Sequence, residues 1–342
     1  MLIAAGLMLA ALLLVFIAAE LFTNALEFVG ERMGVSEGVT GSIFAAIGTA
    51  MPETIVPIVA ILSGGASESV NHAVGMGAIL GAPFMLATLS LGLIGYFAGT
   101  KHGWHTRLDP EPTGLRRDLA VFMTGLVLII ASGQLPPAWQ ESRFILALIL
   151  CLIYFLHLLR TIQASRELVA DGHGTEAGSP LHAGRVMPTH LWSAILQLSI
   201  AMAILIQGAR IFVNGAEQMS TGLGISAFVV SLLVIPVATE LPEKINSILW
   251  IRRRKDTLAF GNITGAMAFQ GTVIPAVGMT LMPWHIHLAS HAGISLLLTL
   301  LGVAWLWRMR PGHRLTPTRL LLNGGLYLIF VVYVLVRYGQ AG

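Results

Sequence analysis

Long apolar stretches separated by short polar segments recur along the chain. Each covers about twenty residues or more, which is the length that a helix needs to cross roughly 30 Å of hydrocarbon. We count ten such stretches, at 2–29, 35–62, 70–99, 115–131, 144–162, 191–214, 225–251, 258–282, 289–307 and 319–336. The pattern therefore predicts an all-α membrane protein with ten transmembrane helices.

The composition supports this interpretation. Of 342 residues, 55% are hydrophobic and only 11% are charged, whereas a soluble protein carries about 25% charged residues. A water-soluble protein is thereby excluded. Cys151 is the single cysteine, so a disulfide framework and a cysteine-based zinc site are excluded too, and no cofactor is expected.

The basic residues indicate topology and not nucleic-acid binding. If the N-terminus is external, sixteen Lys and Arg residues fall on the cytoplasmic side, while only Arg143 and Arg337 fall outside. Basic residues concentrate in cytoplasmic loops. We therefore expect a multi-pass protein of the inner (plasma) membrane, a monomer in the lipid bilayer with both termini external. The longest polar stretch, 164–189, then forms a cytoplasmic linker between 1–163 and 190–342.

The two halves of the chain repeat each other. An offset of 190 aligns 19–58 with 209–248 and gives twelve identities in forty positions without a gap. Five predicted spans separate the copies, so the copies enter the membrane from opposite sides. The sequence thus predicts two inverted five-helix repeats, a plan typical of secondary transporters with a site near the membrane midplane.

Three carboxylates, Glu53, Glu240 and Glu243, lie inside apolar stretches and close to prolines. Carboxylates within the membrane are functional candidates, and a proline interrupts the hydrogen bonds of a helix. Thr49 and Thr239 each precede a glutamate by four residues, which predicts a shared helix face. Carboxylates and hydroxyls suit a hard divalent cation. The alternative is a proline-kinked helix pair whose glutamates stay protonated.

Further polar candidates lie one span later in each copy. His72 and Asn262 occupy equivalent positions, and Gln270 follows Asn262 by two helical turns, where the first copy has Leu80. We count His72, Asn262 and Gln270 as candidate cation ligands. Packing of these glycine-rich segments is the alternative reading.

At these residues the sequence resembles the sodium/calcium exchanger family, the cation/Ca²⁺ antiporters, as a divergent prokaryotic-type member. The two repeats of that family read approximately G-T-S-x-P-E followed by G-N-x-x-G-S-x-x-x-[ND]; this chain has GTAMPE at 48–53 and ATELPE at 238–243. The resemblance implies that Glu53, Glu243, Thr49 and Thr239 are the central divalent-cation ligands. It also implies antiport of Ca²⁺ against Na⁺ or H⁺ by alternating access.

Departures from the family pattern concern the coupling ion. The family serines of the two Pro-Glu motifs, which help to build sodium sites, are Ala50 and Glu240 here. Glu240 could exchange a proton. Lys244 could instead pair with Glu240 as a structural counter-ion, or could stand in for a bound monovalent cation. Arg210 and Glu20, at equivalent positions of the repeat, are read as gating or structural charges.

Other classes of function fit less well. The chain contains no phosphate loop, no Gly-x-Ser-x-Gly and no His-Glu-x-x-His, so an enzyme is not expected. An intramembrane enzyme that uses Glu53 and Glu243 as a metal-bound acid/base pair lacks an evident substrate cleft. The main alternative is a transport-inactive relative that binds cations as a sensor or assembly partner.

Overall fold

The computed structural model describes residues 2–32, 50–63, 67–170, 181–185, 188–308 and 315–339. These residues are almost entirely helical and contain no strand; one isolated antiparallel bridge joins Leu108 to Leu315. The first half comprises α1 (Leu2–Arg32), α4 (Met51–Ser63), α5 (Glu68–Met85), the π-helical turn η2 (Leu86–Ser90), α6 (Leu91–His102), α7 (Pro112–Gln134) and α8 (Gln140–Ala170). The second half comprises the 3₁₀ turn η3 (His182–Arg185), α9 (Leu191–Leu223), α10 (Ala227–Thr239), α11 (Leu241–Arg252), α12 (Asp256–Gln270), α13 (Val273–Leu281), α14 (His291–Trp307) and α15 (Pro317–Gly339).

Each of the ten apolar stretches contains helix within the described part of the chain. Among the described residues, five segments are both long and apolar enough to cross a membrane, namely Ala5–Leu26, Glu68–His102, Gln140–Gln163, Leu191–Leu223 and Pro317–Tyr338. The expected stretches 225–251 and 258–282 are each divided into two shorter helices, α10 with α11 and α12 with α13. The number of crossings stays a prediction.

The surface of the bundle is apolar, as expected for helices in lipid. α8 alone exposes Phe144, Ile145, Leu148 and Leu152, each by more than half of its surface. Acidic and amide side chains, in contrast, are buried between helices at several positions. This distribution reverses the usual pattern of a soluble protein.

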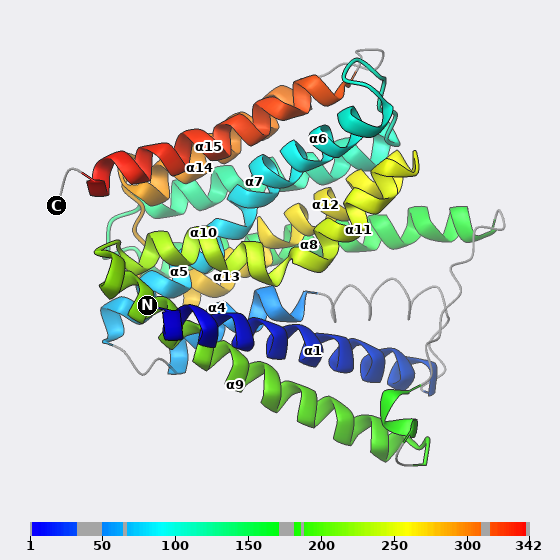
Figure 1. Cartoon of the computed structure of the whole chain (residues 1–342), viewed down its shortest axis with the longest axis horizontal. Helices are drawn as coiled ribbons and strands as arrows, with labels where there is room; N and C mark the ends of the chain where they lie inside the picture. The colour runs from blue at the N-terminus through cyan, green and yellow to red at the C-terminus, as the bar shows by residue number, and fades with distance from the viewer. Residues whose placement is uncertain are drawn as a thin grey trace.

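Two groups of helices make up the molecule (Figure 1). α1 and α9 pack side by side along one edge, and α4 lies against α9. At the opposite edge α6 packs against α15, and α7 against α12 and α14. α5 and α10 pack closely in the middle of the bundle and link the two groups.

α5 approaches α10 through glycines. Gly77 and Gly81 lie one turn apart on α5, and a Cβ on either would overlap α10. Small residues four apart permit such close helix packing in membranes. α5 therefore fixes the position of α10, which ends at one of the two Pro-Glu motifs.

One helix start recurs at the offset of the sequence repeat. α4 begins at Met51 and α11 begins at Leu241, 190 residues later. The start of the helix at the Pro-Glu motif is therefore encoded in both copies of the repeated sequence.

Candidate functional site

The second Pro-Glu motif forms a break between two helices. α10 ends at Thr239, α11 begins at Leu241, and Glu240 between them has non-helical angles of φ −101° and ψ 8°. Pro242 lies in the first turn of α11, where its missing N–H leaves no hydrogen bond unmade. The prediction of a proline-broken helix at this motif is confirmed.

The expected alignment of Thr239 with Glu243 on one helix face stays a prediction. A shared face requires a continuous helix, and the break at Glu240 falls between the two residues. The Thr239 hydroxyl is buried and donates a hydrogen bond of 3.2 Å to the carbonyl oxygen of Ile235. That bond leaves the lone pairs of the hydroxyl oxygen available to a cation. The side chain of Glu243 lies outside the described residues.

In the first copy the structure places Glu53 in the first turn of α4, with 6% of its surface exposed. A carboxylate this deeply buried among apolar helices is rare and needs compensating partners. α4 packs against α5, α9, α10 and α13, so Glu53 belongs to a helix at the centre of the bundle. Thr49 lies outside the described residues, and its pairing with Glu53 stays a prediction.

Glu240, Lys244 and Gln270 come together behind the break. The Lys244 ammonium contacts the Glu240 carboxylate and lies 3.4 Å from the Glu240 carbonyl oxygen. The Gln270 side chain lies close enough to the same carboxylate to interact with it electrostatically. Only 2% of the Glu240 side chain and 6% of the Lys244 side chain are exposed. Of the orientations left open for Lys244, the structure therefore shows the pairing with Glu240.

The ends of two helices add polar backbone to this cluster. α10 ends at Thr239 and α12 ends at Gln270, and the carbonyl end of a helix carries partial negative charge. Broken helices in transporters present such ends to cations. The hydroxyl, carboxylate and amide oxygens of Thr239, Glu240 and Gln270 thus lie beside electronegative helix ends.

Asn262 is positioned by a residue that the sequence analysis missed. Its side-chain amide donates a 2.9 Å hydrogen bond to the hydroxyl of Ser247, which links α12 to α11. Ser247 follows Glu243 by four residues, a spacing that could have identified it. His72, the equivalent of Asn262, is partly buried on α5. Within the part of the chain that the structure describes, no hydrogen bond or ion pair joins His72 to the Glu240 cluster.

A second buried polar cluster centres on Asp118 of α7. The Thr264 hydroxyl of α12 donates to Asp118 at 2.7 Å, and Nε2 of His157 on α8 lies 3.6 Å away. Arg117 lies within 3.8 Å. These side chains connect α12, the helix of Asn262 and Gln270, to α7, and α7 to α8. Asp118 lies within the predicted span 115–131, and a carboxylate inside a predicted span could have identified it as buried.

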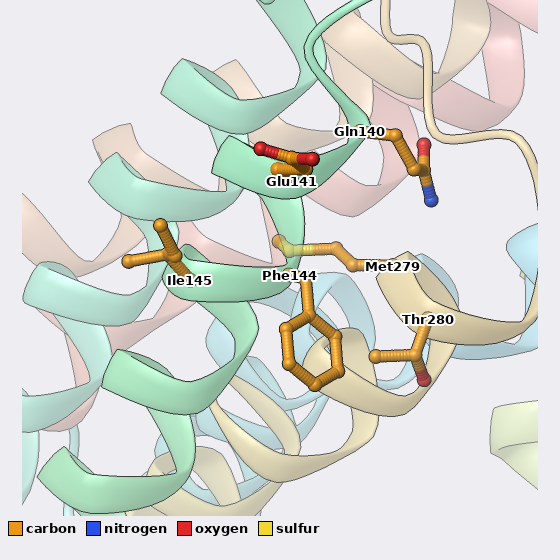
Figure 2. Close-up of a pocket in the computed structure, with 6 residues that line it drawn as sticks. All are labelled: Gln140, Glu141, Phe144, Ile145, Met279 and Thr280. Carbon is orange, nitrogen blue, oxygen red and sulfur yellow. The ribbon is translucent and has the colours of Figure 1, made fainter.

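No group of three or more His, Cys, Asp or Glu side chains that could hold a metal occurs among the described residues, and Thr49 and the Glu243 side chain are not among them. A pocket of about 360 Å³ lies between α8 and α13 (Figure 2). Three apolar side chains, Phe144, Ile145 and Met279, and three polar ones, Gln140, Glu141 and Thr280, line this pocket. It contains none of the predicted ligands.

The charges of the α1 and α9 pair are peripheral. Glu20 is largely exposed, and its carboxylate lies 3.9 Å from Nε2 of His182. Arg210 is exposed on α9. A gating role for Glu20 and Arg210 stays a prediction.

The family can now be identified from the comparison with known proteins. The model of the sodium/calcium exchanger protein family matches residues 3–163 and 193–338, which is most of the chain. The chain belongs to the sodium/calcium exchanger family. The resemblance found in the Pro-Glu motifs is thereby confirmed.

The relatives of this chain have low sequence identity to it, but the similarity extends over most of both chains. The inner membrane protein YrbG of Escherichia coli is 26% identical over 99% of this chain and 98% of its own. The putative antiporter CaxA of Alkalimonas amylolytica is 23% identical over 83% of this chain and 82% of its own.

Solved structures agree on the fold. The H⁺/Ca²⁺ exchanger CAX covers 98% of this chain and 88% of its own, with a TM-score of 0.62 at 15% identity. The sodium–calcium exchanger NCX_Mj covers 96% and 98%, with a TM-score of 0.55 at 18% identity. Together with the apolar surface, family membership makes this chain a membrane protein and supports a cation/Ca²⁺ antiporter.

Proposed function

We propose that this protein is a secondary active antiporter that moves Ca²⁺ across the membrane in exchange for Na⁺ or H⁺ by alternating access. The observation that carries this proposal is the placement of buried polar groups at helix breaks, with Glu53 opening α4 and Glu240 separating α10 from α11. Carboxylates buried at such positions need cationic partners. Lys244 is the partner of Glu240, and a transported cation binds at Glu53.

The proposed ligands are Glu53, Glu243, Thr49 and Thr239. Two carboxylates match the charge of one divalent cation, and neutral hydroxyl oxygens complete the hard-ligand set that Ca²⁺ prefers. Glu240, Gln270, Asn262 and His72 are secondary candidates. Among these, Gln270 and Glu240 are supported by their mutual contact at the ends of α12 and α10.

The proposed architecture consists of two inverted five-helix repeats, 1–163 and 190–342, joined by the cytoplasmic linker 164–189. Support comes from the starts of α4 and α11, which lie 190 residues apart, and from packing that recurs in equivalent pairs. α4 packs on α5 as α11 packs on α12, and α6 packs on α15 as α13 packs on α8. The family model also matches in two segments that flank the linker.

The proposal is tested by ⁴⁵Ca²⁺ uptake into proteoliposomes that contain the purified full chain. We expect uptake above that of protein-free vesicles only when an outward Na⁺ gradient or an outward H⁺ gradient is imposed, and the gradient that drives it identifies the coupling ion. Saturable Ca²⁺ binding without gradient-dependent flux would overturn the proposal in favour of a cation sensor.

A further inference from the structure

The buried ion pair at the second motif occupies positions that are uncharged in the first copy. At the offset of 190, Glu240 corresponds to Ala50 and Lys244 to Thr54. The backbone is the same at both sites, since the N–H of Thr54 donates to the Ala50 carbonyl and the N–H of Lys244 donates to the Glu240 carbonyl, each at 3.2 Å.

The side chains of Thr54 and Lys244 also reach equivalent carbonyl oxygens in the two copies. The Thr54 hydroxyl donates to the Ala50 carbonyl oxygen at 2.7 Å, and the Lys244 ammonium lies 3.4 Å from the Glu240 carbonyl oxygen. The first copy therefore shows that this helix start forms without any ion pair. What Glu240 and Lys244 add to the second copy is charge.

The ammonium is fixed in place. Lys244 is 95% buried, and its ammonium group is held by the carboxylate and the carbonyl of the same residue, Glu240. Separating the pair would leave an uncompensated buried charge, which is strongly unfavourable. A fixed cation beside a fixed carboxylate acts in the same way as a bound monovalent ion that never leaves.

We infer that the Lys244 ammonium is a tethered substitute for one monovalent cation and thereby sets how many mobile ions the exchanger carries. This inference rests on the proposed function. Glu53, Glu243 and Glu240 carry three negative charges, and Lys244 reduces the net charge to two. One Ca²⁺ or two monovalent ions then neutralise these four side chains, so exchange moves no net charge.

Substitutions that convert the second copy to the first separate this role from a structural one. Lys244→Thr leaves a net charge of −3 at these positions, so three monovalent ions would have to bind in exchange for each Ca²⁺. Glu240→Ala leaves a net charge of −1, so one monovalent ion would have to bind. The double variant Glu240→Ala/Lys244→Thr recreates the uncharged first-copy residues and restores a net charge of two.

The experiment measures ⁴⁵Ca²⁺ uptake into proteoliposomes as a function of the internal concentration of the ion that drives the wild type. We expect Hill coefficients of about 2 for the wild type, about 3 for Lys244→Thr, about 1 for Glu240→Ala and about 2 for the double variant. Lys101→Met, which removes an exposed lysine from the last turn of α6, is the matched control and should give about 2.

Membrane potential gives an independent reading. Glu240→Ala would exchange Ca²⁺ for one monovalent ion, so an inside-negative potential of about 100 mV should raise its accumulation ratio about 50-fold. The wild type and the double variant should not respond. If Lys244→Thr fails to fold, Glu240→Ala and the double variant decide the question by themselves.

A purely structural ion pair predicts a different result. Both single variants would then lose thermal stability but keep the wild-type Hill coefficient and remain insensitive to potential, and that result overturns the inference. A wild type without gradient-driven Ca²⁺ flux refutes the proposed function itself, which is a separate failure.

Discussion

Replacing Gly81 by alanine should push α5 and α10 apart. A Cβ at this position would lie 2.8 Å from Cγ of Pro236 and still closer to the carbonyl oxygen of Leu232 on α10. Carbon atoms in contact are separated by about 3.5–4.0 Å, so α10 would have to move by about 1 Å. Overpacking of this kind costs about 1–3 kcal/mol, and alanine in a helix recovers about 0.5–1 kcal/mol relative to glycine.

The expected net effect of Gly81→Ala is a loss of about 1 kcal/mol in the free energy of unfolding, within a range of about 0–2.5 kcal/mol. The control is Gly265→Ala on α12, because a Cβ there meets no atom within 4 Å. The melting temperature of each purified variant in detergent is measured against the wild type. Gly81→Ala should melt lower, and Gly265→Ala should melt at the wild-type temperature or above. A Gly81→Ala variant as stable as the wild type would refute the reasoning.

Two further predictions concern stability. Asp118→Asn should lower the melting temperature in detergent by the equivalent of about 1–3 kcal/mol, because it disturbs buried polar partners. The exposed Asp109, whose side chain pairs with Arg107 at 3.2 Å, is the control, and Asp109→Asn should change stability little. Glu111→Ala removes the N-cap of α7, which accepts from the N–H groups of Thr113 and Gly114, and should cost about 0.5–2 kcal/mol. Although partial burial raises the pKa of Glu111, those hydrogen bonds outweigh it and hold the pKa below 4.5. The stabilisation is therefore present above about pH 4.5 and lost as the pH falls through the folded pKa, so wild-type and Glu111→Ala melting temperatures should converge in acid; a constant difference would contradict this assignment.

The sequence predicted the features that depend on local chemistry and repetition. Apolar length located the helices, and proline next to a buried glutamate located the break at Glu240. The offset of 190 anticipated that α4 and α11 would begin at matching residues. Each of these features follows from which residues lie nearby along the chain.

Features that depend on packing between distant segments were not predictable. Whether Thr239 and Glu243 face the same side depends on the angle between α10 and α11 at the break, which helical periodicity does not give. The choice of Glu240 as the partner of Lys244 required knowledge of where the flexible side chain points. Asp118 meets Thr264 only because α7 and α12 pack together, and one sequence does not specify that contact.

The most direct test of a buried, carboxylate-based exchange site is gradient-driven ⁴⁵Ca²⁺ uptake by wild type and Glu53→Gln side by side. Glu53→Gln keeps the size of the side chain at the start of α4 and removes one negative charge. We expect Ca²⁺ accumulation by the wild type under an outward Na⁺ or H⁺ gradient, and none above protein-free vesicles for the folded variant. Equal gradient-driven accumulation by both proteins would contradict the account.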